Sequence, residues 1–225
     1  MAFVDIQKDL PYADHAFGVA EEKSDTVEDV IRQYTEQLGP IAHMRQVHSD
    51  RVAYVSGPGM YEEADALYTD HADVWLAVKT ADCVPVLVSC PSAVAVVHCG
   101  WRGLKNGILS KTLDILMNEF QGTPTELFIH IGPCIQQKNY EVDESFQHDF
   151  DESFFRESKK KGTVLFDMPA VVRKQAMDMG INDLNIHNTD MCTFSDDRFH
   201  SYRRHKKAGE DGYKVQLSLV RRAVE

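Results

Sequence analysis

The segment Val94-Ala95-Val96-Val97-His98-Cys99-Gly100-Trp101-Arg102-Gly103 carries the strongest indication of the fold in this chain. Its apolar run is typical of a buried β-strand, and it ends on a histidine and a cysteine before a Gly-Trp-Arg-Gly turn. A strand end is a rigid support, so a reactive side chain placed there is held in one position. Successive side chains of a strand point to opposite faces, so His98 and Cys99 should diverge. We predict a strand over residues 94–98 with a functional group at its end.

Two stretches upstream also place a polar group beside a strand. Cys83 lies in the turn Thr80-Ala81-Asp82-Cys83-Val84-Pro85 between two apolar runs, and His48 lies in Arg45-Gln46-Val47-His48-Ser49 before a short strand. Two imidazoles and a thiol could bind a metal ion, or the thiol could act as a nucleophile with a histidine as base. Each residue alone is more often a core residue, and the separations match no short zinc-chelate spacing. The spacing of these residues therefore does not decide between a metal site and a nucleophilic cysteine with a histidine base.

Composition predicts one compact domain over residues 1–225. Of the 225 residues, 43% are hydrophobic and 26% are charged, which is enough for one substantial core, and no linker divides the chain. Five scattered cysteines favour free thiols in a reducing compartment over a disulfide scaffold. The chain begins without a signal-peptide pattern and has no apolar run of membrane-spanning length. We therefore expect a cytoplasmic protein without a membrane partner.

The charge balance argues against nucleic acid as a partner. The formal net charge is −11, whereas phosphate-backbone binding requires a basic surface. The run Arg203-Arg204-His205-Lys206-Lys207 is a local exception. It is either a solvated loop or an anion-attracting rim of a site.

Hydrophobic periodicity predicts alternating helices and strands. Helices are expected from Asp25 to Gly39-Pro40, from about Leu104 to Phe120, and from the N-cap Asp167 to Gly180. Strands are expected at 52–55, 74–78, 85–90, 94–98, 126–131, 184–187 and 213–220. The short connection between the strands at 85–90 and 94–98 predicts a hairpin and hence a mixed sheet. The pattern indicates an α/β (α+β) layered sandwich in which a mixed β-sheet is flanked by helices.

A series of motifs between about residue 40 and residue 204 resembles one family. In chain order they are Gln46-Val47-His48-Ser49, Ala64-Asp65-Ala66-Leu67, Thr80 to Pro85, Val97 to Gly103, Ile131-Gly132-Pro133, Tyr140-Glu141-Val142, and Cys192-Thr193 with Ser201-Tyr202-Arg203-Arg204. They resemble the YfiH-type family, catalogued as polyphenol-oxidase or laccase-domain proteins and later as purine nucleoside phosphorylases. The resemblance implies one YfiH-like domain and three zinc ligands, His48, Cys83 and His98. Cys99, where alanine is common, and residues 136–139, in place of a Gly-Pro-Cys-Cys run, depart from the family pattern without touching that ligand set.

The implied ligand set would leave one position of a tetrahedral zinc ion open, which is typical of a catalytic site. Zinc lowers the pKa of a bound water toward ~7, which suits deamination of adenosine to inosine. Phosphorolysis instead uses phosphate to take the ribose from a purine base, and a cation must hold that anion. We therefore expect a zinc-dependent enzyme whose partners are phosphate and a nucleoside such as adenosine, inosine, guanosine or methylthioadenosine. The sequence assigns no oligomeric state.

Four further residues are candidates for this chemistry. Arg45 and Arg102 lie close to the ligand motifs and could bind phosphate, or each could be a surface arginine with a packed stem. Tyr202 could stack on a base or lie at the rim. Asp82 could act with Cys83 and His98 as a catalytic residue, by orienting a histidine or relaying a proton, or it could form an Asx-turn. Asp65 belongs to a family motif, but the sequence assigns it no role.

Three rival functions stay open. A multicopper polyphenol oxidoreductase needs many histidines, typically in His-x-His pairs, whereas this chain has 10 histidines and no such pair. Copper could still replace zinc adventitiously, because Cu²⁺ outcompetes Zn²⁺ in most such sites. A metal-free amide hydrolase would use Cys83 as nucleophile and His98 as base. The third rival is a binding module without catalytic activity.

Overall fold

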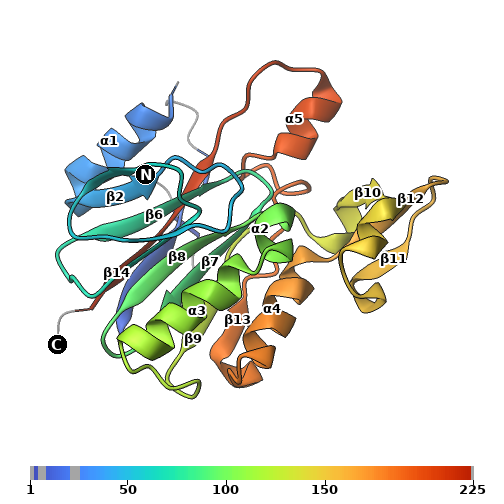
Figure 1. The fold of residues 1–225 in the computed structure, drawn as a ribbon. Helices are drawn as coiled ribbons and strands as arrows, with labels where there is room; N and C mark the ends of the chain where they lie inside the picture. Colours follow the sequence, from blue (N-terminus) through green and yellow to red (C-terminus); the bar gives the residue numbers. More distant parts are fainter. Residues whose placement is uncertain (1–2, 5–8, 21–25, 224–225) are drawn as a thin grey trace.

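Two large β-sheets pack face to face, and helices cover the outer face of each (Figure 1). The computed structural model describes residues 3–4, 9–20 and 26–223. Between the sheets, Leu87, Val94 and Val96 of one sheet pack with Leu76 and Val78 of the other, and all five are fully buried. The α/β class and the layered arrangement predicted from the sequence are confirmed, with two packed sheets at the centre instead of one.

The six-stranded sheet has the order β13-β9-β7-β8-β5-β3. Its members are β3 (Val52–Tyr54), β5 (Ala66–Thr69), β7 (Val84–Ser89), β8 (Val94–Cys99), β9 (Phe128–Ile131) and β13 (Ile186–Asn188). β7 and β8 pair antiparallel, with Pro85 opposite His98, whereas β13 and β9 pair parallel, as do β3 and β5. The predicted hairpin and the mixed character of the sheet are confirmed.

The five-stranded sheet has the order β1-β14-β6-β2-β4. Its members are β1 (Ala13–Phe17), β2 (Ile41–Met44), β4 (Gly59–Tyr61), β6 (Trp75–Thr80) and β14 (Gln216–Arg222). β14 pairs antiparallel with both β1 and β6, and β2 pairs parallel with β6 and β4. The first and last described strands thus lie side by side, which joins the two ends of the chain in one sheet.

A small third sheet projects from one end of the molecule (Figure 1). It has the order β10-β12-β11 and consists of β10 (Glu141–Asp143), β11 (Phe155–Glu157) and β12 (Thr163–Phe166). Phe166 is fully buried there, and its ring lies 4.7 Å from that of Phe150 and 5.0 Å from that of Phe155, measured between centroids. This aromatic cluster anchors an extension whose strands are too short for hydrophobic periodicity to predict.

Three helices cover the outer faces of the large sheets, and two shorter ones lie near strand ends. α1 (Val27–Leu38) packs on the five-stranded sheet, while α3 (Ile108–Glu119) and α4 (Met168–Asp178) lie together on the six-stranded sheet (Figure 1). α2 (Trp101–Lys105) follows β8, and α5 (Tyr202–Ala208) precedes β14. Short 3₁₀ helices cover Gln137–Asn139, Glu144–His148, Glu152–Phe154 and Asp183–Asn185.

The helix predictions are partly confirmed. The Asp167 side chain caps α4 by accepting from the Ala170 amide at 3.0 Å, as expected. The first helix is capped by Thr26, whereas the expected start at Asp25 lies outside the described residues. The single helix predicted from Leu104 to Phe120 is wrong: α2 and α3 are separate. Gly107 adopts a left-handed φ of 79° between them, a conformation that breaks the helical path.

The strand predictions are correct for the core of each large sheet and less so at the edges. The strands expected at 126–131, 184–187 and 213–220 begin later than predicted, at Phe128, Ile186 and Gln216. β1, β2, β4 and β5 were not predicted. β5 is buried along its whole four-residue length, so neither its length nor an alternating pattern marks it as a strand. Within the described part of the chain, no helix is long and apolar enough to cross a membrane.

Candidate metal centre

His48, Cys83 and His98 converge at the end of the central hairpin. One side-chain donor atom from each lies within 4.8 Å of the others, and Cys83 Sγ is 3.9 Å from His48 Nε2. The two imidazole rings meet edge to face with centroids 4.8 Å apart. This is the only cluster of three potential metal ligands found among the described residues. The structure therefore brings together the three residues that the sequence selected.

Strand geometry explains this convergence. Cys83 immediately precedes β7 and His98 lies near the end of β8, and these strands are paired so that Pro85 faces His98. His98 follows Val94 and Val96 toward the space between the sheets, whereas Cys99 joins the core beneath the helices. Burial strongly raises the pKa of the Cys99 thiol, so it stays protonated. Cys99 is thus a core residue on the opposite face from the ligands.

Asp65 organises two of the three ligands. Its fully buried carboxylate accepts a hydrogen bond from His98 Nδ1 at 2.8 Å. The same carboxylate accepts from the amides of Val47, His48 and Ser49 at 3.2, 3.0 and 2.7 Å. His48 has a left-handed φ of 60°, which costs free energy for a residue with a side chain, so these contacts also hold a strained backbone in place. One side chain therefore fixes the ring of His98 and the loop that carries His48.

The Asp65 contacts make His98 suitable as a metal ligand. Burial raises the pKa of Asp65, but hydrogen bonds from His98 and Ser49 outweigh this effect and lower the pKa to about 2. An ionised carboxylate beside Nδ1 favours a proton on that nitrogen, so Nε2 is the atom that can bind a metal ion once it has lost its own proton. Burial lowers the pKa of His98, yet the neighbouring Cys83 and Asp65 raise it overall. Desolvation raises the pKa of the half-buried Cys83 thiol, yet the neighbouring His98 and His48 lower it overall. The interaction between His98 and Cys83 thus favours the thiolate form of Cys83.

The donor set fits zinc. With a Zn–N distance of about 2.0 Å and a Zn–S distance of about 2.3 Å, tetrahedral geometry puts two nitrogens about 3.3 Å apart and a nitrogen and a sulfur about 3.5 Å apart. The Cys83–His48 separation of 3.9 Å is slightly longer than that. Gly100 provides the space: a Cβ there would lie 3.0 Å from His48 Cδ2 and 3.4 Å from Cys83 Sγ. A side chain at position 100 would crowd the ligands, so glycine in the Gly-Trp-Arg-Gly turn serves the site.

The three candidate ligands line a pocket of about 720 Å³. Four cations line it: Arg45, Lys79, Arg102 and Arg203. Three tyrosines line it too, and we call them the aromatic wall: Tyr140, Tyr202 and Tyr213. In a chain of net charge −11, this cluster of cations marks the pocket as suited to an anionic ligand.

The cations differ in how far they are free to bind a ligand. Arg45 forms ion pairs with Glu62 and Glu63, and Arg203 donates to the carbonyl oxygen of Glu141 at 2.8 Å. Arg102 stacks on Trp101, with its guanidinium carbon 4.5 Å from the ring centroid. No carboxylate among the described residues pairs with Arg102 or Lys79. Of the two arginines selected from the sequence, Arg102 is therefore the available one.

The aromatic wall and Asp82 are connected through α5. Tyr202 is 44% exposed and meets Tyr213 edge to face with ring centroids 5.0 Å apart, so both tyrosines present surface to the pocket. The Asp82 carboxylate accepts from Thr193 Oγ1 and from the amide of Arg203, both at 2.6 Å. These partners lie far along the chain, so Asp82 does not form a local Asx-turn. The histidine-orienting role considered for Asp82 belongs to Asp65.

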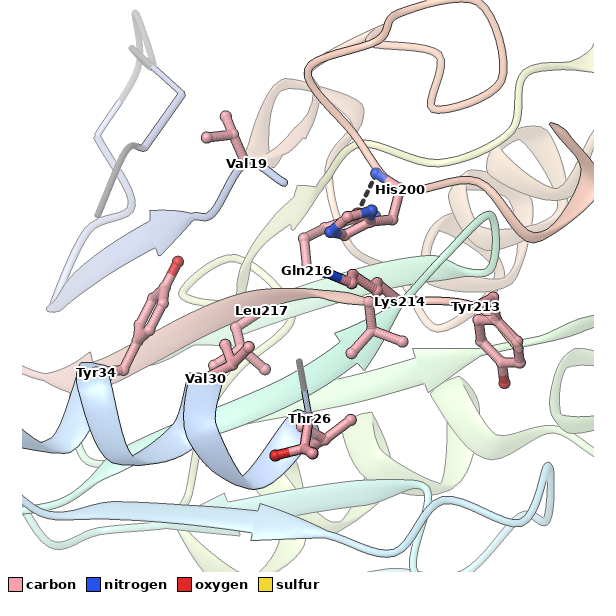
Figure 2. A pocket seen from close by; sticks show the side chains of 11 residues that line it. Val19, Thr26, Val30, Tyr34, His200, Tyr213, Lys214, Gln216 and Leu217 are labelled. Carbon is pink, nitrogen blue, oxygen red and sulfur yellow. Dashed lines mark hydrogen bonds between the residues drawn. The ribbon is translucent and has the colours of Figure 1, made fainter. Parts of the chain in front are cut away.

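A second pocket is too small for a nucleoside. It holds about 40 Å³, roughly the space of one water molecule, and is shown in Figure 2. His200 and Gln216 lie on its wall, where the His200 amide donates to Gln216 Oε1 at 2.8 Å. Tyr213 lines both pockets. Of these two pockets, the one that contains the candidate ligands is large enough to hold a substrate of nucleoside size.

Comparison with known proteins assigns the family. The model of the family described as multi-copper polyphenol oxidoreductase laccase matches residues 8–218. The chain belongs to this family, the YfiH type. It is 33% identical over 176 residues to a purine nucleoside phosphorylase of Haemophilus influenzae, covering 74% of this chain and 70% of the relative. It is 34% identical over 185 residues to one of Corynebacterium glutamicum, covering 79% and 74%.

Two solved structures show that the fold is that of the family. YlmD from Geobacillus stearothermophilus superposes with a TM-score of 0.84 at 23% identity over 99% of both chains. YfiH from Bacillus licheniformis superposes with a TM-score of 0.80 at 22% identity over 94% of this chain and 93% of its own. The YfiH-like fold expected from the sequence motifs is confirmed.

Sequence reasoning left three residues of this YfiH-type site without a role. Asp65 was part of a recognised motif, and its position between Ala64 and Ala66 in a buried stretch was a signal of a partnered carboxylate. Lys79 interrupts an apolar strand, which also marks an unusual position. Nothing in the local sequence singles out Tyr213, because its place in the pocket depends on how α5 and β14 are joined.

Removing the Asp65 charge should release the metal. In Asp65→Asn, the amide nitrogen would face the backbone donors of the His48 loop, so we expect zinc affinity to fall about 10- to 100-fold and the free energy of unfolding to fall by about 2 to 4 kcal/mol. Zinc titration and thermal unfolding measure the two effects. Asp70→Asn is the matched control, because Asp70 is an exposed carboxylate that accepts from Tyr54 and lies near His71, away from the three ligands. Wild-type zinc affinity in Asp65→Asn would contradict the assignment.

Proposed function

We propose that this protein is a zinc-dependent purine nucleoside phosphorylase that cleaves adenosine, inosine or guanosine, and also methylthioadenosine, and that it deaminates adenosine to inosine. The observation that carries the proposal is the convergence of His48, Cys83 and His98 in a cation-lined pocket of about 720 Å³. The names of the curated relatives, purine nucleoside phosphorylase, supply the reaction class. The proposed partners are therefore small molecules, a nucleoside and phosphate.

Phosphorolysis breaks the bond between the purine nitrogen and C1′ of ribose and forms a bond from a phosphate oxygen to C1′. The products are the free base and ribose 1-phosphate. The chain must hold the phosphate in line with C1′ and keep the nucleoside oriented. Arg102 and Lys79 are the residues we assign to the anion, because both line the pocket without a carboxylate partner among the described residues. A planar guanidinium matches two phosphate oxygens at once.

Zn²⁺ held by His48, Cys83 and His98 would supply a Lewis acid with an open coordination position. Asp65 keeps His98 in the tautomer that such a metal ion requires. Tyr202 and Tyr213 offer exposed aromatic faces on which a purine base can stack. Deamination of adenosine replaces the amino group on C6 by oxygen from water and releases ammonia, so it needs no phosphate.

A metal-free amide hydrolase is the second candidate. Its support is the pairing of a Cys83 thiol of lowered pKa with a His98 imidazole of raised pKa, the pattern of an activated nucleophile. Stoichiometric zinc bound through Cys83 would occupy that nucleophile and exclude this candidate. Copper oxidation is the third: the same three residues could bind Cu²⁺, but they supply only one candidate centre within the described residues.

The reaction can be tested directly. We expect the wild-type protein to convert inosine to hypoxanthine in phosphate buffer and Cys83→Ala to abolish this activity. Arg102→Ala should raise the KM for phosphate roughly tenfold or more, since a hydrogen bond to a charged group contributes about 1.5 to 3 kcal/mol. Lys79→Met should act in the same direction, and Arg45→Ala should have a smaller effect because Arg45 is paired with two glutamates. Adenosine deamination should be little changed in Arg102→Ala.

Arg51→Ala is the matched control, because Arg51 is exposed, pairs with Glu63 and does not line the pocket. Steady-state kinetics with phosphate and nucleoside varied separately gives both KM values. If the wild-type protein forms no hypoxanthine, the nucleoside proposal is wrong, and the thiol hydrolase and the binding module without catalytic activity become the leading candidates. If Arg102→Ala and Lys79→Met keep wild-type phosphate dependence, the assignment of the anion holders is wrong.

Acid should remove zinc and activity together. Two imidazoles and one thiol must lose their protons to bind zinc, so protons compete with the metal ion as the pH falls. We expect zinc content and turnover to fall in parallel as the pH is lowered. The loss should begin above the ordinary imidazole pKa of about 6.5, because burial lowers the pKa of His98 but Cys83 and Asp65 outweigh it and raise that pKa overall. The Asp65 carboxylate, with its pKa of about 2, stays ionised throughout this range and does not cause the loss. Metal analysis after dialysis at each pH measures it, and full occupancy at about pH 4.5 would contradict the ligand set.

A further inference from the structure

Asp82 joins three parts of the chain that are distant in sequence. Its side chain is 7% exposed, and its two carboxylate oxygens accept from different donors, Thr193 Oγ1 and the Arg203 amide, each at 2.6 Å. Its own carbonyl oxygen accepts from the Ile135 amide at 3.0 Å. Asp82 also has a left-handed φ of 94°. A strained backbone and a buried charge both cost free energy of folding, and the two short hydrogen bonds of Asp82 offset that cost. Their position therefore indicates a structural role for this carboxylate.

The contact with Arg203 places α5 relative to the metal ligand. Arg203 is the second residue of α5, so Asp82 satisfies one of the amides that a helix leaves free at its N-terminus. The Ser201 side chain satisfies the Arg204 amide at 3.1 Å. A carboxylate at this end of a helix is also favoured by the helix dipole. Because Cys83 is the next residue after Asp82, the first turn of α5 is tied directly to the turn that carries a metal ligand.

The first turn of α5 carries part of the pocket wall. Tyr202 begins α5, contacts Tyr213 and lines the pocket. The guanidinium of Arg203 lies 5.3 Å above the centre of the Tyr140 ring. A shift of this turn would therefore move Tyr202 relative to Cys83 and would change the contacts that Tyr202 makes with Tyr213 and Arg203 makes with Tyr140. The Thr193 contact holds the opposite side of the same carboxylate and stops it from following such a shift.

We propose that Asp82 is a positioning residue that sets the distance between the aromatic wall and the metal centre, and thereby determines how tightly the purine base is bound. Each carboxylate oxygen accepts from a donor that does not titrate, a hydroxyl on one side and an amide on the other, and this arrangement favours a positioning role over a proton relay. Neither oxygen contacts His48 or His98 among the described hydrogen bonds. This proposal rests on the nucleoside function proposed above.

Two substitutions weaken the contacts of the Asp82 carboxylate, one at Asp82 itself and one at its hydrogen-bond partner Thr193. Asp82→Asn keeps one acceptor oxygen, and asparagine tolerates a positive φ, so it adds no backbone strain. Thr193→Val keeps the shape of the buried side chain but removes the hydroxyl donor. Thr193→Ser retains that donor and is the matched control. Thr193 does not line the pocket, and its carbonyl oxygen also accepts from Arg204 of α5, so the comparison of Thr193→Val with Thr193→Ser isolates the hydroxyl contact with Asp82.

We expect Asp82→Asn and Thr193→Val to raise the KM for inosine about fivefold to tenfold, with kcat within about threefold of wild type and zinc content unchanged. Thr193→Ser should behave as wild type. A proton relay predicts a different split, a large fall in kcat for Asp82→Asn with unchanged KM and no effect of Thr193→Val. That result, or loss of zinc from either variant, would overturn the proposal.

Amide hydrogen exchange gives a readout that does not depend on turnover. The Arg203 amide donates to Asp82, so we expect it to exchange faster in Asp82→Asn and Thr193→Val than in wild type and Thr193→Ser. Unchanged exchange of the Arg203 amide in both variants would refute the claim that Asp82 holds the first turn of α5. Failure of the wild-type protein to cleave inosine would refute the nucleoside function instead, and the exchange measurement would still decide whether Asp82 positions α5.

Discussion

The site depends on one buried carboxylate. Asp65 accepts hydrogen bonds from the His98 ring, from three consecutive amides of the His48 loop and from the Ser49 hydroxyl. Such a carboxylate is stable away from water only when its donors surround it, and its low pKa of about 2 reflects them. The Asp65 carboxylate therefore fixes the tautomer of His98 and the backbone conformation of the loop that carries His48. The third ligand, Cys83, is brought to the same point by the pairing of β7 with β8.

The pocket above these ligands combines two kinds of surface. Cations gather there although the chain as a whole carries a net charge of −11, and exposed tyrosine faces lie on the same wall. Phosphate binding and base stacking need these two surfaces side by side. The single cluster of three ligands found in the described part of the chain argues against several copper centres, although the family description names a multi-copper oxidoreductase. The fold and the family therefore do not decide which reaction the protein catalyses. The chemistry of this one cluster decides it.

The sequence predicted those features that depend on local pattern. The hairpin of β7 and β8 and the cap of α4 follow from short stretches of residues, whereas the set of three candidate ligands came from motifs that resemble the family. The sequence did not predict the break at Gly107, the short strand β5 or the role of Asp65. The role of Asp65 depends on tertiary contacts, because the loop before β3 and the end of β8 meet around its carboxylate. The choice between Arg45 and Arg102 likewise required the positions of Glu62 and Glu63.

The central claim is that two histidines and one cysteine form a single open zinc centre. X-ray absorption at the zinc edge of the purified, zinc-loaded protein tests it most directly. The account predicts one sulfur at about 2.3 Å together with nitrogen or oxygen ligands at about 2.0 to 2.1 Å, two of them imidazoles. A shell without sulfur, or a shell with two or more sulfurs, would contradict the assignment of His48, Cys83 and His98.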